Sequence, residues 1–331
     1  ESYVYVADSA NHVIRRVTIA DGTTETLAGN PGERGYADGR GTAARFYSPY
    51  GIAFDAGRLY VADTLNNLIR TIDPDTGTVD TLAGVPKRTG FVDGSGREAR
   101  FNQPIGIAVG EGVLFVSDSV NQTIRRVDAA NGRVTTIAGG VGKTGADDGK
   151  GPAARFHQPF GIAVDGDRLF VSDTWNHTIR VITLDDNTVT TLAGLAGEKG
   201  FVFGRGEWAR FNDPAGVASD GKRLFVVDSS NHAVRAAALG EDYFLPVAGK
   251  AAEFGAVDGY GGAARFSSPG GIAGDGHELF IADTDNHAIR RLSPATGEVR
   301  LLAGGVETGP DHAPSPRGPY ARGERLRAGP C

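Results

Sequence analysis

The sequence predicts an all-β protein, a β-propeller of six blades, and two observations carry this prediction. The motif Asp-Thr-Trp-Asn-His-Thr-Ile-Arg at residues 173–180 has five further copies, and each leading Asp lies 55 residues after the one before it, from Asp8 to Asp283. Each repeat also holds four short apolar runs separated by turn-forming residues. Because such a unit buries its faces only against its neighbours, six copies indicate a ring-closed or stacked array.

The repeat that follows Pro159 shows the four expected strands most clearly. Asp165-Gly166-Asp167 and Asp185-Asp186-Asn187 separate runs of β-branched and apolar residues, which is a strong hairpin signal. Four antiparallel strands in a meander make one propeller blade. The expected strands of this blade are residues 160–164, 168–172, 178–182 and 188–193.

The connection between two blades is long, and in this repeat it runs from Gly194 to Asp213. Gly206 to Phe211 inside it predict one helical turn. By the strand order, these linkers share one rim with the loops between second and third strands, and we call this rim the long-loop face. An Arg-Phe pair recurs in the linkers. We expect the Phe to fill the space between adjacent blades and the Arg to hold linker carbonyl groups. The pairs are Arg45-Phe46, Arg100-Phe101, Arg155-Phe156, Arg210-Phe211 and Arg265-Phe266.

Blade 1 is expected to begin at its second strand, because the sequence opens on the second-strand pattern Tyr3-Val4-Tyr5-Val6. Residues 1–305 are expected to form the propeller, with blade 1 starting at its second strand. Residues 306–331 are a Pro- and Arg-rich tail that has lost the linker signal, and they are expected to be a degenerate or truncated ring-closing strand. Complete first strands begin near Pro49, Pro104, Pro159, Pro214 and Pro269.

Charge and composition argue against two classes of partner. Lys and Arg number 34 against 40 Asp and Glu, a net charge of −6, so a broad basic face for nucleic acid is not expected. No apolar run approaches the ~18–20 residues that cross a bilayer. The single cysteine, Cys331, rules out an intrachain disulfide. The compartment stays open, with a secreted or periplasmic location slightly favoured over the cytoplasm.

The core Asn-His-x-Ile/Val-Arg, preceded by an apolar strand end and Asp, resembles the NHL repeat. The Phe-x-x-Pro-x-Gly-Ile/Val-Ala entry of the first strand is also similar to this family, and the match extends to about residue 304. The resemblance implies a six-bladed β-propeller. The family includes protein-interaction modules, RNA binders in tripartite-motif proteins and amidating lyases with central metals, so it implies no single activity. Asn11-His12, Asn176-His177, Asn231-His232 and Asn286-His287 keep the pair, whereas Asn66-Asn67 and Asn121-Gln122 lose the His.

Features present in all copies are expected to be scaffold. In the hairpin, Asp8 and Arg15 point to one face and are close enough to pair across it. The histidines lie one per blade at equivalent places, so they cannot converge on an ion whose ligands must lie within ~2.3 Å. We therefore expect no metal at these residues and no cofactor. The histidines concerned are His12, His177, His232 and His287.

The innermost strands line the channel and carry no ionisable side chain. A typical one reads Phe160-Gly161-Ile162-Ala163-Val164. Propeller hydrolases and lyases place acidic, amide or histidine side chains on or just above these strands. Catalysis in the channel is therefore not expected, and no Ser/His/Asp order or internal Cys nucleophile stands out. The alternative is a metal-dependent lyase or hydrolase at the channel mouth, through His157, Asn102 and Asn212.

Positions that differ between copies are where a specific function is expected. Leu65, Val120 and Trp175 occupy one loop position on three consecutive blades, and Phe91 and Trp208 lie in nearby linkers. Apolar tips side by side predict a binding site for a protein or peptide partner. The competing interpretation is that these side chains pack under the linkers. For Trp175 the sequence supports partner binding and packing equally, and for Trp208 it favours packing.

A second variable set lies just before the first strands. Tyr47, Asn102, His157 and Asn212 form a polar ring at the channel mouth. Such a ring suits a small polar ligand or ordered water. Taken together, these patterns predict a non-enzymatic scaffold that binds a protein or peptide through its long-loop face.

Overall fold

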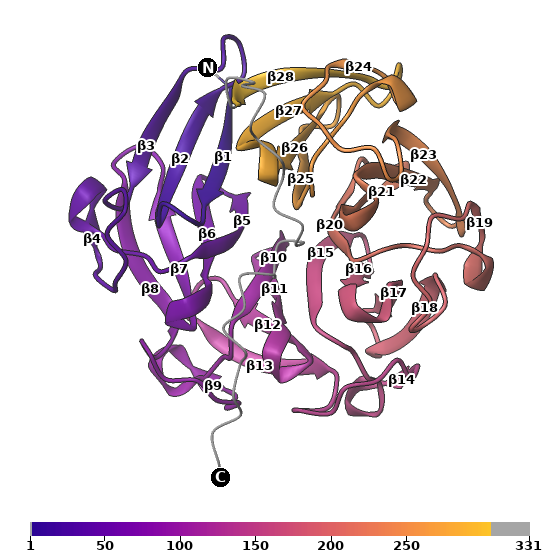
Figure 1. Cartoon of the computed structure of the whole chain (residues 1–331). Helices are drawn as coiled ribbons and strands as arrows, with labels where there is room; N and C mark the ends of the chain where they lie inside the picture. Colours follow the sequence, from indigo (N-terminus) through magenta and orange to yellow (C-terminus); the bar gives the residue numbers. More distant parts are fainter. Residues whose placement is uncertain (1, 306–331) are drawn as a thin grey trace.

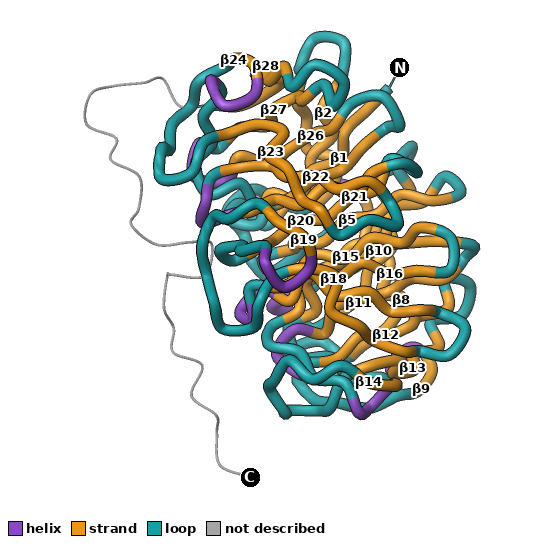
Figure 2. The backbone as a smooth tube through the Cα atoms, turned by 90° about the vertical axis from the view of Figure 1, so that its right-hand side faces the viewer, coloured by secondary structure: helices purple, strands orange, loops and turns teal. Residues whose placement is uncertain are grey.

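Six antiparallel β-sheets stand around one central axis in the computed structural model, which describes residues 2–305 (Figure 1). Five sheets contain five strands each, and the first contains three. The prediction of a six-bladed propeller is therefore confirmed. The hairpin turns lie on one face of the ring, and the long loops and most of the short helical turns lie on the other (Figure 2).

The strands follow the chain blade by blade. Blade 1 has β1 (Tyr3–Asp8), β2 (Val13–Thr18) and β3 (Thr24–Ala28). Blade 2 has β4 (Gly39–Arg40), β5 (Pro49–Asp55), β6 (Arg58–Asp63), β7 (Leu68–Asp73) and β8 (Thr78–Gly84). Blade 3 has β9 (Gly94–Ser95), β10 (Pro104–Gly110), β11 (Val113–Asp118), β12 (Thr123–Asp128) and β13 (Arg133–Ala138). Blade 4 has β14 (Gly149–Lys150), β15 (Pro159–Asp165), β16 (Arg168–Asp173), β17 (Thr178–Thr183) and β18 (Thr188–Ala193). Blade 5 has β19 (Gly204–Arg205), β20 (Pro214–Ser219), β21 (Arg223–Asp228), β22 (Ala233–Ala238) and β23 (Tyr243–Gly249). Blade 6 has β24 (Gly259–Tyr260), β25 (Gly271–Gly274), β26 (Leu279–Asp283), β27 (Ala288–Leu292) and β28 (Glu298–Gly304).

Short 3-10 turns mark two places in the repeat. One set follows the two-residue strands: η1 (Gly41–Ala43), η3 (Gly96–Glu98), η5 (Gly151–Ala153), η7 (Gly206–Trp208) and η9 (Gly261–Ala263). The other set connects second and third strands: η2 (Thr64–Asn66), η4 (Ser119–Asn121), η6 (Thr174–Asn176), η8 (Ser229–Asn231) and η10 (Thr284–Asn286). The helical turn expected near Gly206 is therefore present, as one turn of 3-10 helix.

Blades 2 to 6 each have the four predicted long strands and one short strand that the repeat pattern did not reveal. In blade 4 the order from the axis outward is β15, β16, β17, β18 and β14. Gly149 and Lys150 of β14 pair with Val189 and Thr188 of β18. The pairing arises because the incoming linker runs back along the outer strand. A strand of two residues has no periodicity of its own, so the sequence cannot signal it.

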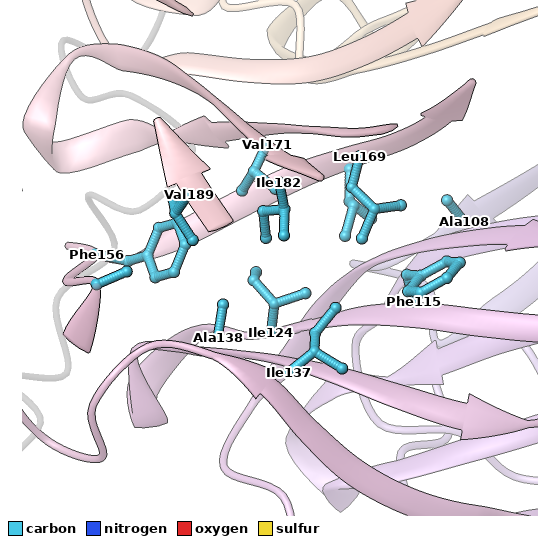
Figure 3. Packing of buried hydrophobic residues seen from close by; sticks show 12 residues of the cluster. Ala108, Phe115, Ile124, Ile137, Ala138, Phe156, Leu169, Val171, Ile182 and Val189 are labelled. Carbon is cyan, nitrogen blue, oxygen red and sulfur yellow. The ribbon is translucent and has the colours of Figure 1, made fainter. Parts of the chain in front are cut away.

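The hydrophobic core lies between blades, not within them. The cluster in Figure 3 joins Ile124 and Ala138 of blade 3 to Val171 and Val189 of blade 4, around the fully buried ring of Phe156. Each blade thus buries its apolar faces against its two neighbours, as expected for stacked repeats. The prediction that the linker phenylalanine fills the space between blades is confirmed at Phe46, Phe101, Phe156, Phe211 and Phe266.

Neighbouring inner strands pack closely because each carries a glycine. A Cβ on Gly161 would lie 2.2 Å from the carbonyl oxygen of Ala215 in the next inner strand, β20. The corresponding distance from Gly106 to the Phe160 carbonyl oxygen is 2.0 Å. These glycines are needed for close approach of two backbones, since their φ angles are not positive.

Blades 6 and 1 meet through their outer parts. A Cβ on Gly22, in the β2–β3 turn, would lie 2.0 Å from the Leu302 carbonyl oxygen of β28, and Gly132 lies against Leu82 in the same way at 2.3 Å. Among residues 2–305, the ring of inner strands consists of β5, β10, β15, β20 and β25, and blade 1 contributes none. The predicted role of residues 306–331 in closing the ring concerns residues outside the described part of the chain. Within residues 2–305, no helix is long and apolar enough to span a membrane.

Candidate partner-binding site

The repeated Asp and Arg form a fully buried ion pair between the second and third strands of each complete blade. In blade 4, Arg180 Nη1 lies 2.8 Å from Asp173 Oδ2. The same oxygen accepts a hydrogen bond from Asn176 at 2.7 Å, and Asp173 Oδ1 accepts one from the backbone N–H of His157 at 2.7 Å. Burial raises the pKa of Asp173 to about 6, against the lowering effects of Arg180 and of these hydrogen bonds.

Arg180 also fixes the linker to the hairpin. Its Nη2 lies 2.8 Å from Asp148, its Nη1 donates to the Arg155 carbonyl at 2.8 Å, and its guanidinium lies over the ring of Phe156 at 5.1 Å. One buried side chain therefore holds three segments together. The predicted pairing of the repeated Asp and Arg is confirmed, and it belongs to the scaffold. The equivalent pairs are Asp8–Arg15, Asp63–Arg70, Asp118–Arg125, Asp228–Arg235 and Asp283–Arg290.

Blade 5 holds its arginine differently. Phe203 stands where the other linkers have Asp, so among residues 2–305 Asp228 is the one carboxylate paired with Arg235, at 3.3 Å. The rings of Phe201, Phe203 and Phe211 surround the guanidinium, with centroids 5.4, 5.6 and 4.3 Å away. Cation–π contacts thus take the place of the outer ion pair. The change leaves the Phe203 ring exposed.

Three of the repeated histidines, His12, His177 and His232, connect their blade to the next one. His177 Nδ1 accepts a hydrogen bond from the backbone N–H of Asp213 at 3.2 Å. Asn67 and Gln122 accept the equivalent bond through their side-chain oxygens, at 2.9 and 2.6 Å. These contacts explain why Asn and Gln replace His in two copies. Among residues 2–305, no group of three His, Cys, Asp or Glu side chains is placed to hold a metal.

Replacing His177 by Asn is expected to make stability less dependent on pH. Burial lowers the pKa of His177 below its ordinary 6.5; the Asp213 carboxylate opposes this shift and the nearby Lys199 adds to it. The unfolded chain takes up this proton first, so the stability contribution is complete above pH 6.5 and is lost as pH falls through the folded-state pKa. The Asn variant should differ by less than about 1 kcal/mol at pH 8.

The measurement is urea unfolding of the wild type and of His177→Asn between pH 8 and pH 5. Asn67→His is the matched reverse swap, and it should add the acid-dependent loss that His177→Asn removes. Parallel stability curves for all three proteins would contradict this role of the histidine.

The predicted partner-binding residues at the loop tips and the predicted ligand residues at the channel mouth are hydrogen-bonded to each other within each blade. The backbone N–H of each loop tip donates to the carbonyl of the residue that the sequence placed at the channel mouth. The residues Tyr47, Asn102, His157 and Asn212 are all half-buried, so their ring stays a hypothesis for a small polar ligand. The pairs are Leu65 with Tyr47 at 3.0 Å, Val120 with Asn102 at 3.2 Å, Trp175 with His157 at 3.1 Å and Ser230 with Asn212 at 3.1 Å.

Trp175 is the most exposed member of the predicted row. Its side chain is 43% exposed, whereas Leu65 and Val120 are half-buried. Its ring meets the His157 imidazole edge to face, with centroids 5.1 Å apart. Burial lowers the pKa of His157, and the nearby His177 adds to this lowering, so the imidazole beside Trp175 is neutral at physiological pH. Trp175 thus stands on a supporting ring with much of its surface facing solvent.

The structure does not bring the other two predicted partner residues to this row. The half-buried ring of Phe91 lies under the guanidinium of Arg125 at 4.8 Å, so it supports the buried ion pair. Trp208 lies on η7, which follows β19 at the outer edge of blade 5 (Figure 1). It is 72% exposed. The Trp208 side chain therefore faces solvent and does not pack under the linker.

Sequence reasoning assigned no role to four further apolar residues of blade 5. Tyr243, Leu245 and Pro246 are exposed on β23, and Phe203 directly precedes β19, which pairs with β23. Arg205 of β19 lies over the Tyr243 ring at 5.8 Å. A comparison of equivalent positions along the repeat, instead of the shared motif, would have found them. The residues at the same positions in blade 4 are Asp148, Thr188, Thr190 and Thr191, all polar.

Comparisons with known proteins agree with this architecture. The NHL repeat family model matches residues 156–182. NHL repeat-containing protein 2 of Gallus gallus is 30% identical over 334 residues, covering 90% of this chain and 45% of that protein. Protein SUPPRESSOR OF QUENCHING 1, chloroplastic, of Arabidopsis thaliana is 34% identical over 203 residues, covering 57% of this chain and 19% of that protein. The chain spans less than half the length of these curated relatives.

A solved structure shows the same fold. It is a structural genomics protein of unknown function from Bacteroides thetaiotaomicron, with a TM-score of 0.64 and 19% identity. The match covers 87% of this chain and 66% of that one. At this identity the likeness concerns the fold alone.

Proposed function

Because this chain belongs to the NHL-repeat six-bladed β-propellers, whose fold suits a scaffold, we propose that it binds a protein or peptide through its long-loop face and performs no catalysis. The site is the part of that face formed by blades 4 and 5, together with the adjoining outer edge of blade 5. We call this surface the blade 4–5 sector. It is centred on Trp175, Leu195, Phe203, Trp208, Tyr243 and Leu245, and Leu65 of blade 2 and Val120 of blade 3 continue the row of loop tips on the two preceding blades.

The distribution of exposed apolar side chains carries the proposal. Seven of the fourteen large apolar side chains that are exposed among residues 2–305 lie between Trp175 and Leu245. Scattered apolar residues are normal on a protein surface, but a gathering within one sector is typical of an interaction site. Trp and Tyr are also the residues that contribute most binding energy at interfaces.

One linker makes the sector continuous. The linker leaves β18 and touches the Trp175 loop, where the Gly197 N–H donates to the Asn176 carbonyl at 3.2 Å. It then runs outward to Phe203, whose ring meets Phe201 at 5.1 Å, and on to Trp208. The exposed residues therefore follow one path from the channel mouth to the outer edge of the ring.

The enzymatic alternative needs a site at the channel mouth. His157, Asn102 and Asn212 sit on three adjacent blades, and the imidazole of His157 already packs against Trp175. The backbone N–H groups of Asn102 and Asn212 are bound by Asp118 and Asp228, at 2.7 Å each. The side chains of these three residues are thus the groups that a metal or substrate would use. Metal analysis of the purified protein tests this alternative directly.

Replacing Trp175 by Ser or Trp208 by Ala is expected to weaken partner binding by about tenfold to a hundredfold, the effect of losing an aromatic anchor. The probe is a linear peptide selected from a display library on the immobilised wild-type chain. The chain has two tryptophans, so Trp175→Phe and Trp208→Phe each leave one fluorescent reporter of the bound peptide.

Leu301→Ser is the matched control, because Leu301 is 51% exposed but lies on β28 of blade 6. The affinity of this variant for the selected peptide should equal that of the wild type. A selected peptide that binds all variants equally, or that changes neither tryptophan emission, would contradict the proposed sector.

A further inference from the structure

The outer strand of blade 5 is apolar at two positions that are polar in every other blade. Tyr243 and Leu245 lie two residues apart on β23, so their side chains project to the same side of the strand, and both are exposed. The residues at the Tyr243 position elsewhere are Thr23, Thr78, Arg133, Thr188 and Glu298, and those at the Leu245 position are Glu25, Asp80, Thr135, Thr190 and Arg300. The apolar pair is therefore a property of blade 5 and not of the repeat.

A polar contact between the linker and the outer strand is replaced at both of its ends in blade 5. In blade 4, Asp148 of the linker accepts hydrogen bonds from the N–H and the hydroxyl of Thr191, at 3.1 and 2.9 Å. Blade 3 has the same contact. Blade 5 has Phe203 in place of the carboxylate and Pro246 in place of the threonine. Because proline has no N–H, this edge is poorly suited to pairing with an added strand, and a partner would be held by side-chain packing.

The apolar edge continues onto the incoming linker. β19 pairs antiparallel with β23, and this register places Phe203 opposite Leu245. A Cβ on Gly204 would lie 3.1 Å from the Trp208 Cβ, so the indole begins next to β19 at the outer edge of the ring (Figure 1). We call the surface formed by Phe203, Trp208, Tyr243, Leu245 and Pro246 the blade 5 edge patch.

The size of the blade 5 edge patch matches one half of a dimer interface. The exposed fractions of its four large side chains range from 39% for Tyr243 to 72% for Trp208. Since an aromatic side chain carries about 150–250 Å² of surface, the patch offers roughly 500 Å² of apolar area. A standard interface buries about 800 Å² on each partner, and about 60% of that area is apolar. Two copies of this patch facing each other would therefore supply the apolar part of a stable interface.

The charges at the two ends of β23 are opposite. Glu241 and Asp242 lie at its start, where Arg205 pairs with Asp242 at 3.4 Å, so negative charge is in excess there. Lys250 and Arg265 lie at its end and pair with the same glutamate, so positive charge is in excess there. A two-fold axis perpendicular to β23 would place the start of one strand opposite the end of the other. The patch is thus complementary to itself, as an isologous interface requires.

We propose that the blade 5 edge patch binds a second copy of this chain and forms a two-fold symmetric dimer. The apolar side chains of the patch form the centre of the contact, and the charged ends of β23 set the antiparallel orientation. The inference rests on the proposed blade 4–5 sector, of which it assigns the outer part to self-association. The loop tip at Trp175 lies outside the contact and stays available to a peptide.

The test is analytical ultracentrifugation of the chain from nanomolar to high micromolar concentration. Reducing conditions keep Cys331 from forming an intermolecular disulfide. A reversible dimer with twice the mass of one chain is expected. Replacing Tyr243 and Leu245 together by Thr, the residue at both positions in blade 4, should weaken the dimer at least a hundredfold and leave the unfolding temperature unchanged.

An exchange of charges tests the orientation of the two copies. Glu241→Lys and Lys250→Glu each place like charges opposite each other, so each variant alone should dimerise at least tenfold more weakly than the wild type. An equimolar mixture of the two variants has opposite charges at both ends of the contact and should dimerise like the wild type. A mixture that dimerises no better than either variant alone would contradict the two-fold arrangement.

Two matched variants should leave the dimer unchanged. Leu301→Ser alters an exposed leucine of blade 6, and Trp175→Ser alters the loop tip outside the contact. Because Trp175→Ser is expected to lose the selected peptide and to keep the dimer, failure of the proposed function and failure of this inference are distinguishable. A wild-type chain that stays monomeric throughout, or a dimer that survives the double replacement of Tyr243 and Leu245, would overturn the proposal.

Discussion

Replacing Asp173 by Ala is expected to lower the free energy of unfolding by about 3–5 kcal/mol, the usual result of removing one partner of a buried ion pair. The change leaves the buried guanidinium of Arg180 without its inner carboxylate. It also removes one of the two acceptors of the Asn176 amide and leaves the N–H of His157 without its acceptor. Urea unfolding at pH 8 measures the loss. At this pH the wild-type carboxylate is ionised, because its pKa is about 6.

Asp148→Asn is the control on the same arginine. Asp148 also pairs with Arg180, at 2.8 Å, but its side chain is 49% exposed. Pairs of this kind contribute about 0–1 kcal/mol, so the loss should stay within that range. Blade 5 already dispenses with this outer carboxylate, since Phe203 replaces it. Equal losses for the two variants would show that burial does not decide the importance of the pair.

Replacing Gly161 by Ala is expected to destabilise the ring by about 3 kcal/mol, at the upper end of the usual cost of overpacking. The added Cβ would lie 2.2 Å from the Ala215 carbonyl oxygen and 3.0 Å from the Ser172 hydroxyl. Both contacts involve groups with little freedom to move, because Ser172 donates to that same carbonyl. Thermal and urea unfolding of the variant measure the effect.

Gly271→Ala is the matched control in blade 6, where the corresponding space contains no neighbouring inner strand among residues 2–305. Its stability should lie within about 1 kcal/mol of the wild type, the range of substitutions away from tight packing. A loss as large as that of Gly161→Ala would mean that close approach of the next strand is not the reason for the glycine.

The repeat predicted most of the fold because each of its signals was local or was repeated six times. Asp173 and Arg180 lie seven residues apart in a hairpin, so their pairing follows from strand geometry alone. The phenylalanine at the position of Phe156 recurs in five linkers, so its burial between blades was predictable. The short strand β14 was not predictable, because its two residues form a strand only by pairing with the outer strand β18, which follows much later in the chain.

The candidate site was harder to predict because it depends on contacts between blades. The acceptor role of His177 requires the N–H of Asp213, which lies 36 residues away in the next blade. Phe91 and Trp208 look alike in the sequence, as aromatic residues in linkers. One of them supports the Arg125 guanidinium and the other faces solvent, and only the packing of the linker distinguishes them.

We propose that the residues by which blades 4 and 5 differ from the other copies form the binding site. The most direct test is the triple variant Trp175→Ser, Phe203→Asp and Trp208→Ala, in which each new residue is the one found at that position in another blade: Ser230, Asp148 and Ala153. The measurement compares its unfolding temperature and its affinity for the selected peptide with those of the wild type. We predict an unchanged unfolding temperature and at least a hundredfold loss of affinity. Unchanged affinity for the selected peptide in the folded triple variant would contradict the proposed binding site.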